Sequence, residues 1–399
     1  MKFAFIIPDG MGDYPVSKLN GKTPVEYAKT PNLDKISLNG ETGLSHTTPN
    51  GFSPGSDVCI SSLLGYNPEI YYSGRAPFEA RALDIPISNN DLIMRLNFIN
   101  ISEQETINDH SAGHITTDEA DELIKALAKE LETDDFKFYT GISYRHILLW
   151  KNKPDFDCKM TPPHDVPGAP FKGYLPAGKD AKKIVEMILK SREILDKHPV
   201  NLRRKKENKP TANLMWPWGN GYMPKMETFK EKFKVKGAVI SAVGLIKGLA
   251  KFLDLKEIDV PGITAHFDTD YHAKGQYAIE ALKEHDLIII HIEAPDEAGH
   301  IADIEEKVKA IERIDEHIIG PVLNALEKYG DFRIMVSPDH YTPVEKRIHV
   351  NNPVPYAICG TDITTKSNLT FSEKHAAKNR IVFLDGYKLM PYFLGIKTD

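Results

Sequence analysis

RIMVSPDHYTPVEKRIH, residues 333–349, joins a short apolar run to a group of side chains that can bind metal. The run Ile334–Val336 stops at a Ser-Pro pair, so we expect a buried strand that ends there. Asp339 and His340 follow side by side, and His349 comes nine residues later. Carboxylate and imidazole are ligands that Zn²⁺ or Mn²⁺ accepts. Taken alone, the stretch is equally compatible with an ordinary polar surface loop.

A second stretch, DLIIIHIEAPDEAGH at residues 286–300, repeats this arrangement. Leu287–Ile292 is apolar throughout, which is typical of a strand buried on both faces. The run ends near Pro295, and Asp296 and His300 follow four residues apart. If that segment is helical, both side chains lie on one face and can reach one ion.

The first residues, MKFAFIIPDGMGD, supply a third strand that ends in an acid. Lys2–Ile7 reads as a core strand, and Asp9 follows it. An Asp-Gly pair often marks only a turn. Because carboxyl ends of parallel strands meet at one sheet edge, Asp9 becomes a candidate ligand beside the other two groups. Together the three stretches predict a two-metal centre.

The segment GFSPGSDVCISSLLGY, residues 51–66, places Ser56 at the start of an expected apolar helix over Val58–Leu64. One interpretation is that Ser56 merely caps this helix. The other is that it is a nucleophile: a helix N-terminus favours a bound phosphoryl group, and a metal lowers the pKa of a coordinated hydroxyl.

Composition excludes several classes of protein. The 399 residues are 41% apolar and 27% charged, with a net charge of −6. These values indicate an ordinary globular chain and argue against a nucleic-acid partner. Cys59, Cys158 and Cys359 are few and widely spaced, which favours a reducing, cytoplasmic location over a disulfide framework. No signal peptide or membrane span is expected.

Residues 97–222 are dense in His, Arg, Lys and Pro, so we predict an inserted α+β cap domain there. The remaining residues, 1–96 and 223–399, alternate apolar strand and helix patterns. This indicates an α/β core with a doubly wound, mainly parallel sheet. A hairpin over Lys137–Tyr139 and Arg145–Trp150 and a long helix over Ile304–Leu326 are expected. Candidate anion-binding residues are His110, His114, Arg145, His164, Asp165 and Arg204 in the cap and Lys274 in the core.

The motifs PDGMGD, TPNLDK, GSDVCISSLLGYNP, SGRAPFEA, EAPDEAGH and PDHYTP, with His349 before NNPVPY, occur in order through nearly the whole chain. In this combination the chain resembles the cofactor-independent phosphoglycerate mutases of the archaeal-type branch, within the alkaline phosphatase superfamily. The resemblance implies an alkaline-phosphatase-like core, a phosphoserine intermediate and two divalent ions. Manganese is commonest, and cobalt, zinc or magnesium also occur. One ion is expected at Asp9, Ser56, Asp339 and His340, and the other at Asp296, His300 and His349.

The implied reaction interconverts 3-phosphoglycerate and 2-phosphoglycerate. Ser56 takes the phosphoryl group, glycerate reorients, and its other hydroxyl takes the group back. Arg145, Arg204 and Lys274 are expected to hold the acid, together with Asp165 of the cap. His114 is the first candidate for the proton-transferring group, and His164 is the second.

Two departures from the family pattern leave the phosphoryl acceptor open. His110 and His114 stand where arginines are expected, and MWPWGNG at Met215–Gly221 stands where a different sequence is expected. EAPDEAGH also occurs in a bacterial subgroup proposed to phosphorylate homoserine. A homoserine kinase-like phosphotransferase is therefore an alternative, although no P-loop motif is present. A metal-dependent phosphatase and a non-catalytic metal-binding protein are further alternatives. The expected partner is a small phosphorylated acid, with no nucleic acid or membrane, and the chain is expected to be a monomer or small homo-oligomer.

Overall fold

The structure is a computed structural model that describes residues 1–396, and the chain forms two compact units. The first unit contains Met1–Tyr72 and the chain from Met226 onward, and the second is Ser73–Lys225. We had predicted residues 73–96 in the core domain, yet they lie in the second unit. The reason is strand β3 (Leu92–Ile101), which pairs with three other strands of that unit.

The first unit is built on an eight-stranded sheet in the order β13-β2-β12-β11-β1-β10-β8-β9. Strand β1 is central and pairs in parallel with β10 and β11, whereas β12 pairs antiparallel with both β11 and β2. The predicted strands at residues 2–7 and 287–292 are both present. Its strands are β1 (Lys2–Pro8), β2 (Glu41–Ser45), β8 (Gly237–Ile240), β9 (Lys256–Glu257), β10 (Leu287–Ile292), β11 (Phe332–Val336), β12 (Val354–Gly360) and β13 (Val382–Phe383).

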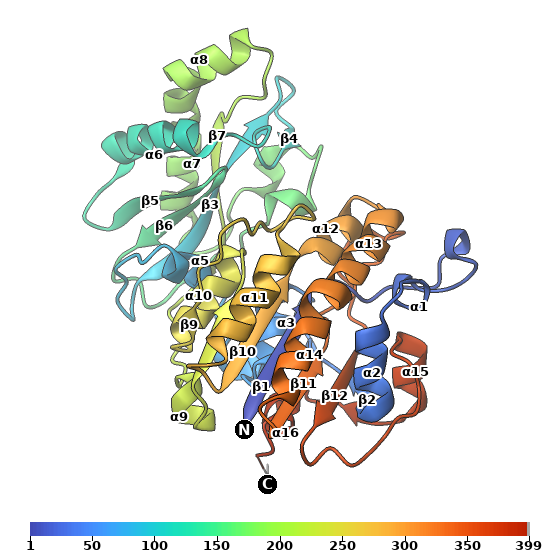
Figure 1. Cartoon of the computed structure of the whole chain (residues 1–399). Helices are drawn as coiled ribbons and strands as arrows, with labels where there is room; N and C mark the ends of the chain where they lie inside the picture. The colour runs from blue at the N-terminus through green and yellow to red at the C-terminus, as the bar shows by residue number, and fades with distance from the viewer. Residues whose placement is uncertain (397–399) are drawn as a thin grey trace. The chain divides into compact units, whose positions relative to one another are not determined.

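Helices cover both faces of this sheet, which confirms the doubly wound α/β prediction. Helices α2, α11, α13 and α14 cover the face seen in front in Figure 1, where their apolar side chains meet Ala4 and Ile6 of β1. On the other face, Phe3 and Phe5 contact Phe393 of α16. The helices are α1 (Pro24–Tyr27), α2 (Pro31–Asn39), α3 (Ser56–Leu63), α4 (Pro68–Tyr71), α9 (Phe229–Phe233), α10 (Gly244–Phe252), α11 (Tyr271–Ala281), α12 (Ala294–His300), α13 (Ile304–Ile314), α14 (Gly320–Glu327), α15 (Glu373–Lys378) and α16 (Leu389–Phe393).

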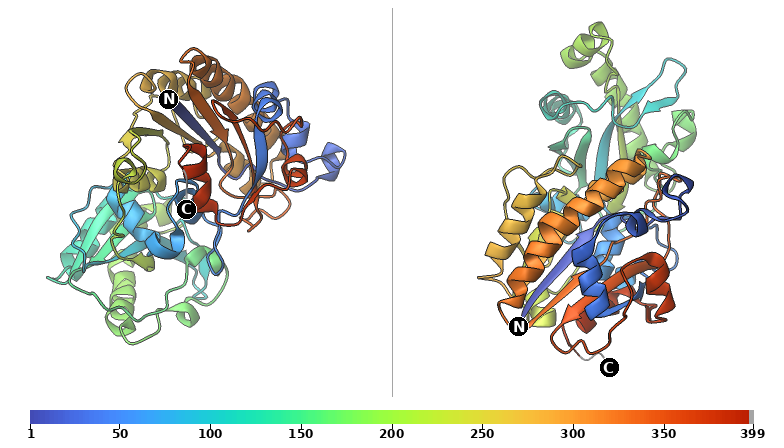
Figure 2. Two further views of the ribbon diagram at one scale, coloured as in Figure 1. Left: turned by 90° about the horizontal axis from the view of Figure 1, so that it is seen from below. Right: turned by 45° about the vertical axis from the view of Figure 1, so that its right-hand side comes forward.

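The long helix predicted over Ile304–Leu326 is present but is not uniformly α-helical. A π-helical turn, η4 (Asp315–Ile319), lies between α13 and α14, and the three run on as one continuous helix, drawn in orange in Figure 2. Helix α11 approaches this turn closely: a Cβ on Gly275 would lie 2.2 Å from the carbonyl oxygen of His317. Only glycine allows this approach.

The second unit is a five-stranded antiparallel sheet covered by α6 and α7. Its strands are β3, β4 (Ile107–Asp109), β5 (Phe136–Ile142), β6 (Arg145–Trp150) and β7 (Leu214–Gly221), and β5 and β6 form the predicted hairpin. Its helices are α5 (Ala76–Ala82), α6 (Thr117–Leu131), α7 (Ala181–Asp196) and α8 (Pro199–Lys206). Across residues 1–396, every helix is too short or too polar to cross a bilayer.

Candidate active site

The carboxyl ends of β10, β1 and β11 lie side by side because these strands are adjacent and parallel. Ile7 of β1 is level with His291 of β10, and Ile6 is level with Val336 of β11. Asp9 follows β1, Asp339 follows β11, and Asp296 lies in α12, which begins directly after β10. The sheet therefore brings the three predicted acids to one edge.

The first cluster contains Asp9, Asp339, His340 and Ser56. The Nε2 atom of His340 lies 3.4 Å from Asp9 Oδ1, 3.2 Å from Asp339 Oδ2 and 3.3 Å from Ser56 Oγ. Both carboxylates and the imidazole are buried. Backbone amides of Gly10 and His340 donate to Asp339 Oδ1, at 3.1 and 2.9 Å, and thereby fix that carboxylate.

The second cluster contains Asp296, His300 and His349. The Nε2 atom of His300 lies 3.2 Å from Asp296 Oδ2 and 3.0 Å from His349 Nε2, which is itself 3.4 Å from Asp296 Oδ1. The other ring nitrogen of His300 lies 3.0 Å from the carbonyl oxygen of Arg347. The rings of His349 and His340 stack at 3.9 Å, so the two clusters are neighbours.

The donor geometry fits two divalent metal ions. Atoms that share one ion at about 2.0–2.2 Å lie about 3.0–3.6 Å from one another, which is the range of the distances within each cluster. Asp9 Oδ1 and Asp339 Oδ2 are buried and have no hydrogen-bond partner among residues 1–396. Both atoms face His340 Nε2. Buried, unpaired carboxylate oxygens need a cation, because their desolvation is otherwise uncompensated.

The charges of the clusters agree with this assignment. Burial, together with the nearby carboxylates of Asp339, Glu293 and Asp296, raises the pKa of Asp9 well above its ordinary value. Burial opposes ionisation of Asp296 as well, but hydrogen bonds from His300 and His349 hold its pKa well below the ordinary value. The region thus concentrates negative charge that divalent cations would neutralise.

Ser56 is the first residue of α3, and the structure excludes the interpretation that it caps this helix. The cap position is Gly55, and no side chain within the described chain makes a capping hydrogen bond there. The Ser56 hydroxyl is instead directed to His340, is partly exposed, and lies in the positive field at the helix N-terminus. This is a suitable position for a nucleophile.

Sequence reasoning missed two residues next to Asp9. His291 Nε2 lies 2.7 Å from Asp9 Oδ2 and 3.5 Å from Glu293 Oε2, and His291 is completely buried. Burial, with Lys274 nearby, lowers the pKa of His291 to about 3. A signal was available, because His291 is the one polar residue in the run LIIIHI.

Lys274, a candidate anion-binding residue, lies within α11 and is buried. Its Nζ donates to the carbonyl oxygen of His291 at 2.8 Å. Burial, only partly offset by Glu293, lowers its pKa to about 8. The side chain therefore adjoins the first cluster through His291, and whether it also binds substrate stays a prediction.

In the second unit, ring contacts join four of the predicted residues. His110 and His114 lie 6.0 and 6.2 Å from the ring of Tyr144, and the guanidinium of Arg145 lies 5.4 Å from that ring. His110 also lies 6.0 Å from His164. The structure thus gathers cationic and titratable groups here, as a binding surface for an anion requires.

Further members of this group were not predicted. The ring of Trp218 lies 5.0 Å from that of His164 and 4.1 Å from the guanidinium of Arg95, which pairs with Glu79 at 2.8 Å. Burial lowers the pKa of His164 to about 4, and Arg95 adds to this effect against the opposing charge of Asp165. A charged residue in the apolar run LIMRLNFINI was the available signal for Arg95.

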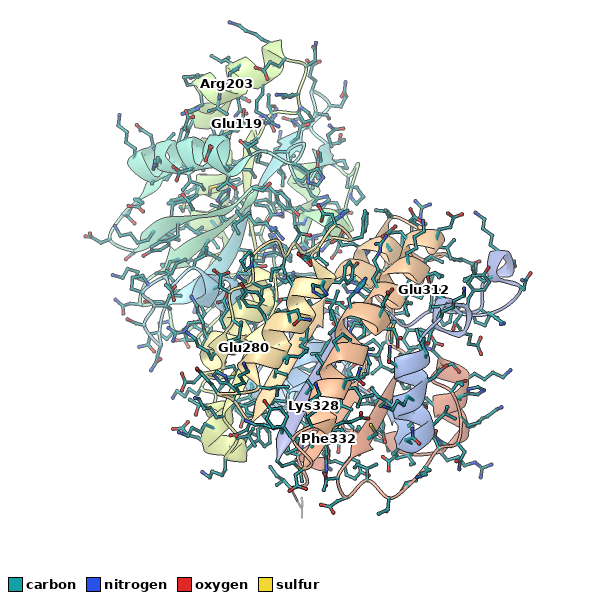
Figure 3. All side chains as sticks on the ribbon, in the orientation of Figure 1. Glu119, Arg203, Glu280, Glu312, Lys328 and Phe332 are labelled. Carbon is teal, nitrogen blue, oxygen red and sulfur yellow. The ribbon has the colours of Figure 1, made fainter. Side chains whose placement is uncertain are left out.

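Arg204 and Asp165 are placed differently from this group. The guanidinium of Arg204 is buried and donates to Glu119 at 2.6 Å and to the carbonyl oxygens of Ala112 and Pro210 at 2.8 Å each. Figure 3 labels Glu119 on α6 beside Arg203 on α8, which shows where this network ties the two helices together. Arg204 thus has a structural function, so we leave it out of the proposed binding set. Asp165 is exposed beside His164.

The fold and the paired acid and imidazole clusters define the class, which is the alkaline phosphatase superfamily of α/β enzymes. Residues 174–378 match the model of the type I phosphodiesterase / nucleotide pyrophosphatase family, and residues 38–201 match that of the 2,3-bisphosphoglycerate-independent phosphoglycerate mutase. A protein of Methanosarcina acetivorans with the latter name is 46% identical over 380 residues, covering 95% of this chain and 96% of its own. The chain therefore belongs to the 2,3-bisphosphoglycerate-independent phosphoglycerate mutase family.

Solved structures agree with this assignment. A protein of Pyrococcus horikoshii has a TM-score of 0.84 and 30% identity, with 100% of this chain and 98% of that chain covered. The cofactor-independent phosphoglycerate mutase of Thermoplasma acidophilum has a TM-score of 0.67 and 27% identity, with 99% of each chain covered.

Proposed function

We propose that this protein is a cofactor-independent phosphoglycerate mutase that interconverts 3-phosphoglycerate and 2-phosphoglycerate through a phosphoserine. The observation that carries the proposal is the position of Ser56 at the start of α3, with its hydroxyl 3.3 Å from His340 in a buried cluster of acids. Family membership over nearly the full length of the chain supports the same reaction.

Each group has a proposed function in this reaction. Asp9, Asp339 and His340, with Ser56, would hold one divalent ion, and a second set would hold the other: Asp296, His300 and His349. When bound, the ions supply charge neutralisation for the transferring phosphoryl group and lower the pKa of the Ser56 hydroxyl. Ser56 Oγ attacks the phosphorus, and the O–P bond to glycerate breaks. The other hydroxyl of glycerate then takes the phosphoryl group back, which regenerates Ser56.

Two further tasks, binding of glycerate and proton transfer, need residues outside the metal clusters. His114 and His164 of the second unit are the candidates for proton transfer. Arg145 and Lys274 are the candidates for holding the carboxylate, and Asp165 is a further candidate for contact with the substrate. Support for them consists of the ring contacts that join His114, His164 and Arg145, and of the contact of Lys274 with His291.

The test is phosphorus NMR of the Mn²⁺-loaded protein with 3-phosphoglycerate and no other phosphoryl donor. We expect 2-phosphoglycerate to appear with the wild-type protein and no conversion above background with Ser56→Ala. Ser61→Ala is the matched control, because Ser61 lies in the same helix and its hydroxyl donates to the Asp57 carbonyl oxygen at 2.6 Å. This control should convert substrate at about the wild-type rate.

Other reaction products would contradict the proposal and indicate a different function. Release of inorganic phosphate without 2-phosphoglycerate would indicate a phosphatase. Inert 3-phosphoglycerate, together with phosphorylation of homoserine from a nucleotide, would indicate the kinase-like alternative. Activity that survives in Ser56→Ala would remove the nucleophile assignment.

Manganese is the proposed ion, with cobalt, zinc and magnesium as alternatives, because carboxylate and imidazole donors suit all of them. We also infer that the protein works in the cytoplasm on a small phosphorylated acid, without nucleic acid or membrane partners. The free state of Cys59, Cys158 and Cys359 supports this location. A monomer or small homo-oligomer is proposed, and light scattering of the purified chain would decide between them.

A further inference from the structure

A line of hydrogen bonds crosses the ends of three adjacent strands next to the first cluster. Strands β8, β10 and β1 are neighbours in the sheet, and each contributes one buried side chain at its carboxyl end: Ser241, His291 and Asp9. Ser241 Oγ lies 3.2 Å from His291 Nδ1, and His291 Nε2 lies 2.7 Å from Asp9 Oδ2. None of the motifs that carry the family resemblance includes Ser241 or His291.

The partners fix the direction of each hydrogen bond. An ionised Asp9 can only accept, so the proton of the neutral imidazole must be on Nε2. His291 Nδ1 is then an acceptor and takes the hydroxyl proton of Ser241. The backbone N–H of Val243 donates to Ser241 Oγ at 3.1 Å, which leaves that hydroxyl proton free to point at His291. Asp9 thereby sets the tautomer of His291, and the hydrogen bond from Ser241 to Nδ1 holds the ring in its orientation.

This line also decides which oxygen of Asp9 is available. His291 occupies Oδ2, whereas Oδ1 faces His340 Nε2 at 3.4 Å and has no hydrogen-bond partner in the described chain. We propose that His291, oriented by Ser241, is a positioning residue that holds Asp9 so that it binds its ion through Oδ1 alone. The inference rests on the proposed metal centre and deepens it. Partners that orient a ligand in this way typically change metal affinity by about 10- to 100-fold.

A third ion held by Asp9, His291 and Glu293 is the competing interpretation, and the geometry disfavours it. The 2.7 Å between His291 Nε2 and Asp9 Oδ2 is shorter than the about 3.0 Å that separates two ligands of one ion, but it is ordinary for a direct hydrogen bond. The ammonium group of Lys274 also donates to the carbonyl oxygen of His291 at 2.8 Å, and a cation there would repel a second cation.

The test compares two isosteric amides at position 291 by calorimetric titration of the full-length protein with Mn²⁺. In His291→Gln, the amide nitrogen stands near the place of Nε2 and can still donate to Asp9. In His291→Asn, the amide reaches only the place of Nδ1 and can meet Ser241 but not Asp9. We expect one of the two Mn²⁺ sites to weaken by about 10- to 100-fold in His291→Asn. In His291→Gln the loss should stay below about threefold.

Ser241→Ala supplies a second and milder variant, with an expected loss of about three- to tenfold, because it removes the hydrogen bond that orients the His291 ring but leaves the Nε2 donor to Asp9. Circular dichroism checks that each variant folds. Wild-type Mn²⁺ affinity in both His291→Asn and Ser241→Ala would overturn the proposal. So would equal losses in His291→Asn and His291→Gln, which would indicate packing only. Because the readout is metal binding, a negative mutase assay leaves this test intact.

Discussion

At the scale of single residues, Gly10 fixes how closely β1 approaches the second cluster. Its φ is +59°, and a Cβ there would lie 2.5 Å from Asp296 Oδ1 and 2.6 Å from Thr342 Oγ1. The Thr342 hydroxyl donates to this same Asp296 oxygen. An added methyl group would therefore displace both the hydrogen-bond donor and the carboxylate.

We expect Gly10→Ala to weaken Mn²⁺ binding by at least tenfold and to lower the free energy of unfolding by about 2–4 kcal/mol, from backbone strain plus overpacking. Gly21→Ala is the matched control, since Gly21 has φ +73° and no described atom lies within 4 Å of an added Cβ. It should lose only the strain, about 1 kcal/mol, and keep Mn²⁺ binding. Urea unfolding and calorimetry measure both quantities, and similar behaviour of the two variants would contradict the role of the contact.

Residue by residue, the sequence predicted the groups that stand at strand ends and missed those that support them. Asp9, Asp296 and Asp339 were accessible because each follows an apolar run that stops abruptly. His291 was missed because it lies inside such a run, where a polar residue has no periodic pattern to reveal it. The burial of Lys274 could not be predicted, because it depends on packing against β10, which local sequence does not record.

At the scale of elements, helix α2 is capped from a distant part of the chain. Thr30 occupies the cap position of α2 but makes no side-chain capping bond within the described residues. Asp315 of the π-turn η4 instead accepts from the backbone amides of Leu33 and Asn32, at 2.7 and 3.2 Å. A cap that comes from nearly 300 residues away cannot be read from a local motif.

Asp315→Ala should therefore lower the free energy of unfolding by about 2–3 kcal/mol, because it leaves helix N–H groups of α2 without their buried acceptor. Thr30→Val removes only a hydroxyl at nearly constant volume and should change the free energy by less than about 0.5 kcal/mol. Denaturant unfolding monitored by circular dichroism measures both. A larger loss in Thr30→Val than in Asp315→Ala would show that Thr30 is the true cap.

At the scale of the whole molecule, the unfolding of the two units can be followed separately, because they contain different reporter groups. Both metal clusters lie in the first unit, whereas all three tryptophans, Trp150, Trp216 and Trp218, lie in the second. Tryptophan fluorescence therefore follows unfolding of the second unit, and the difference between it and circular dichroism follows the first.

Mn²⁺ at 100 times its dissociation constant should stabilise the first unit by about 2.7 kcal/mol per site. We expect the thermal midpoint measured by circular dichroism to rise with Mn²⁺ and fall with a chelator, whereas the tryptophan midpoint stays constant. The control for ionic strength is the same measurement with Ca²⁺ in place of Mn²⁺, in a buffer without Mg²⁺. Equal shifts of both midpoints would show instead that the two units unfold as one cooperative body.

The insertion itself was predictable from the change in composition, but its start was not. Residues 73–96 continue the apolar patterns of the core, and long-range contacts assign them to the second unit: β3 pairs with β4, β6 and β7, and α5 packs against Ile93 and Ile147. Pairing partners are long-range information, so a boundary that depends on them lies beyond sequence patterns.

The central position of β1 has a consequence for the order in which the protein can be made. A ribosome synthesises β1 long before its two neighbours in the sheet, β10 and β11, which begin only at Leu287 and Phe332. All of Ser73–Lys225 leaves the ribosome before either neighbour exists, and domains generally fold as units during synthesis. The nascent chain must therefore keep the apolar strand β1 from aggregating for most of translation. The first metal cluster is complete only after His340 has emerged, and the second only after His349.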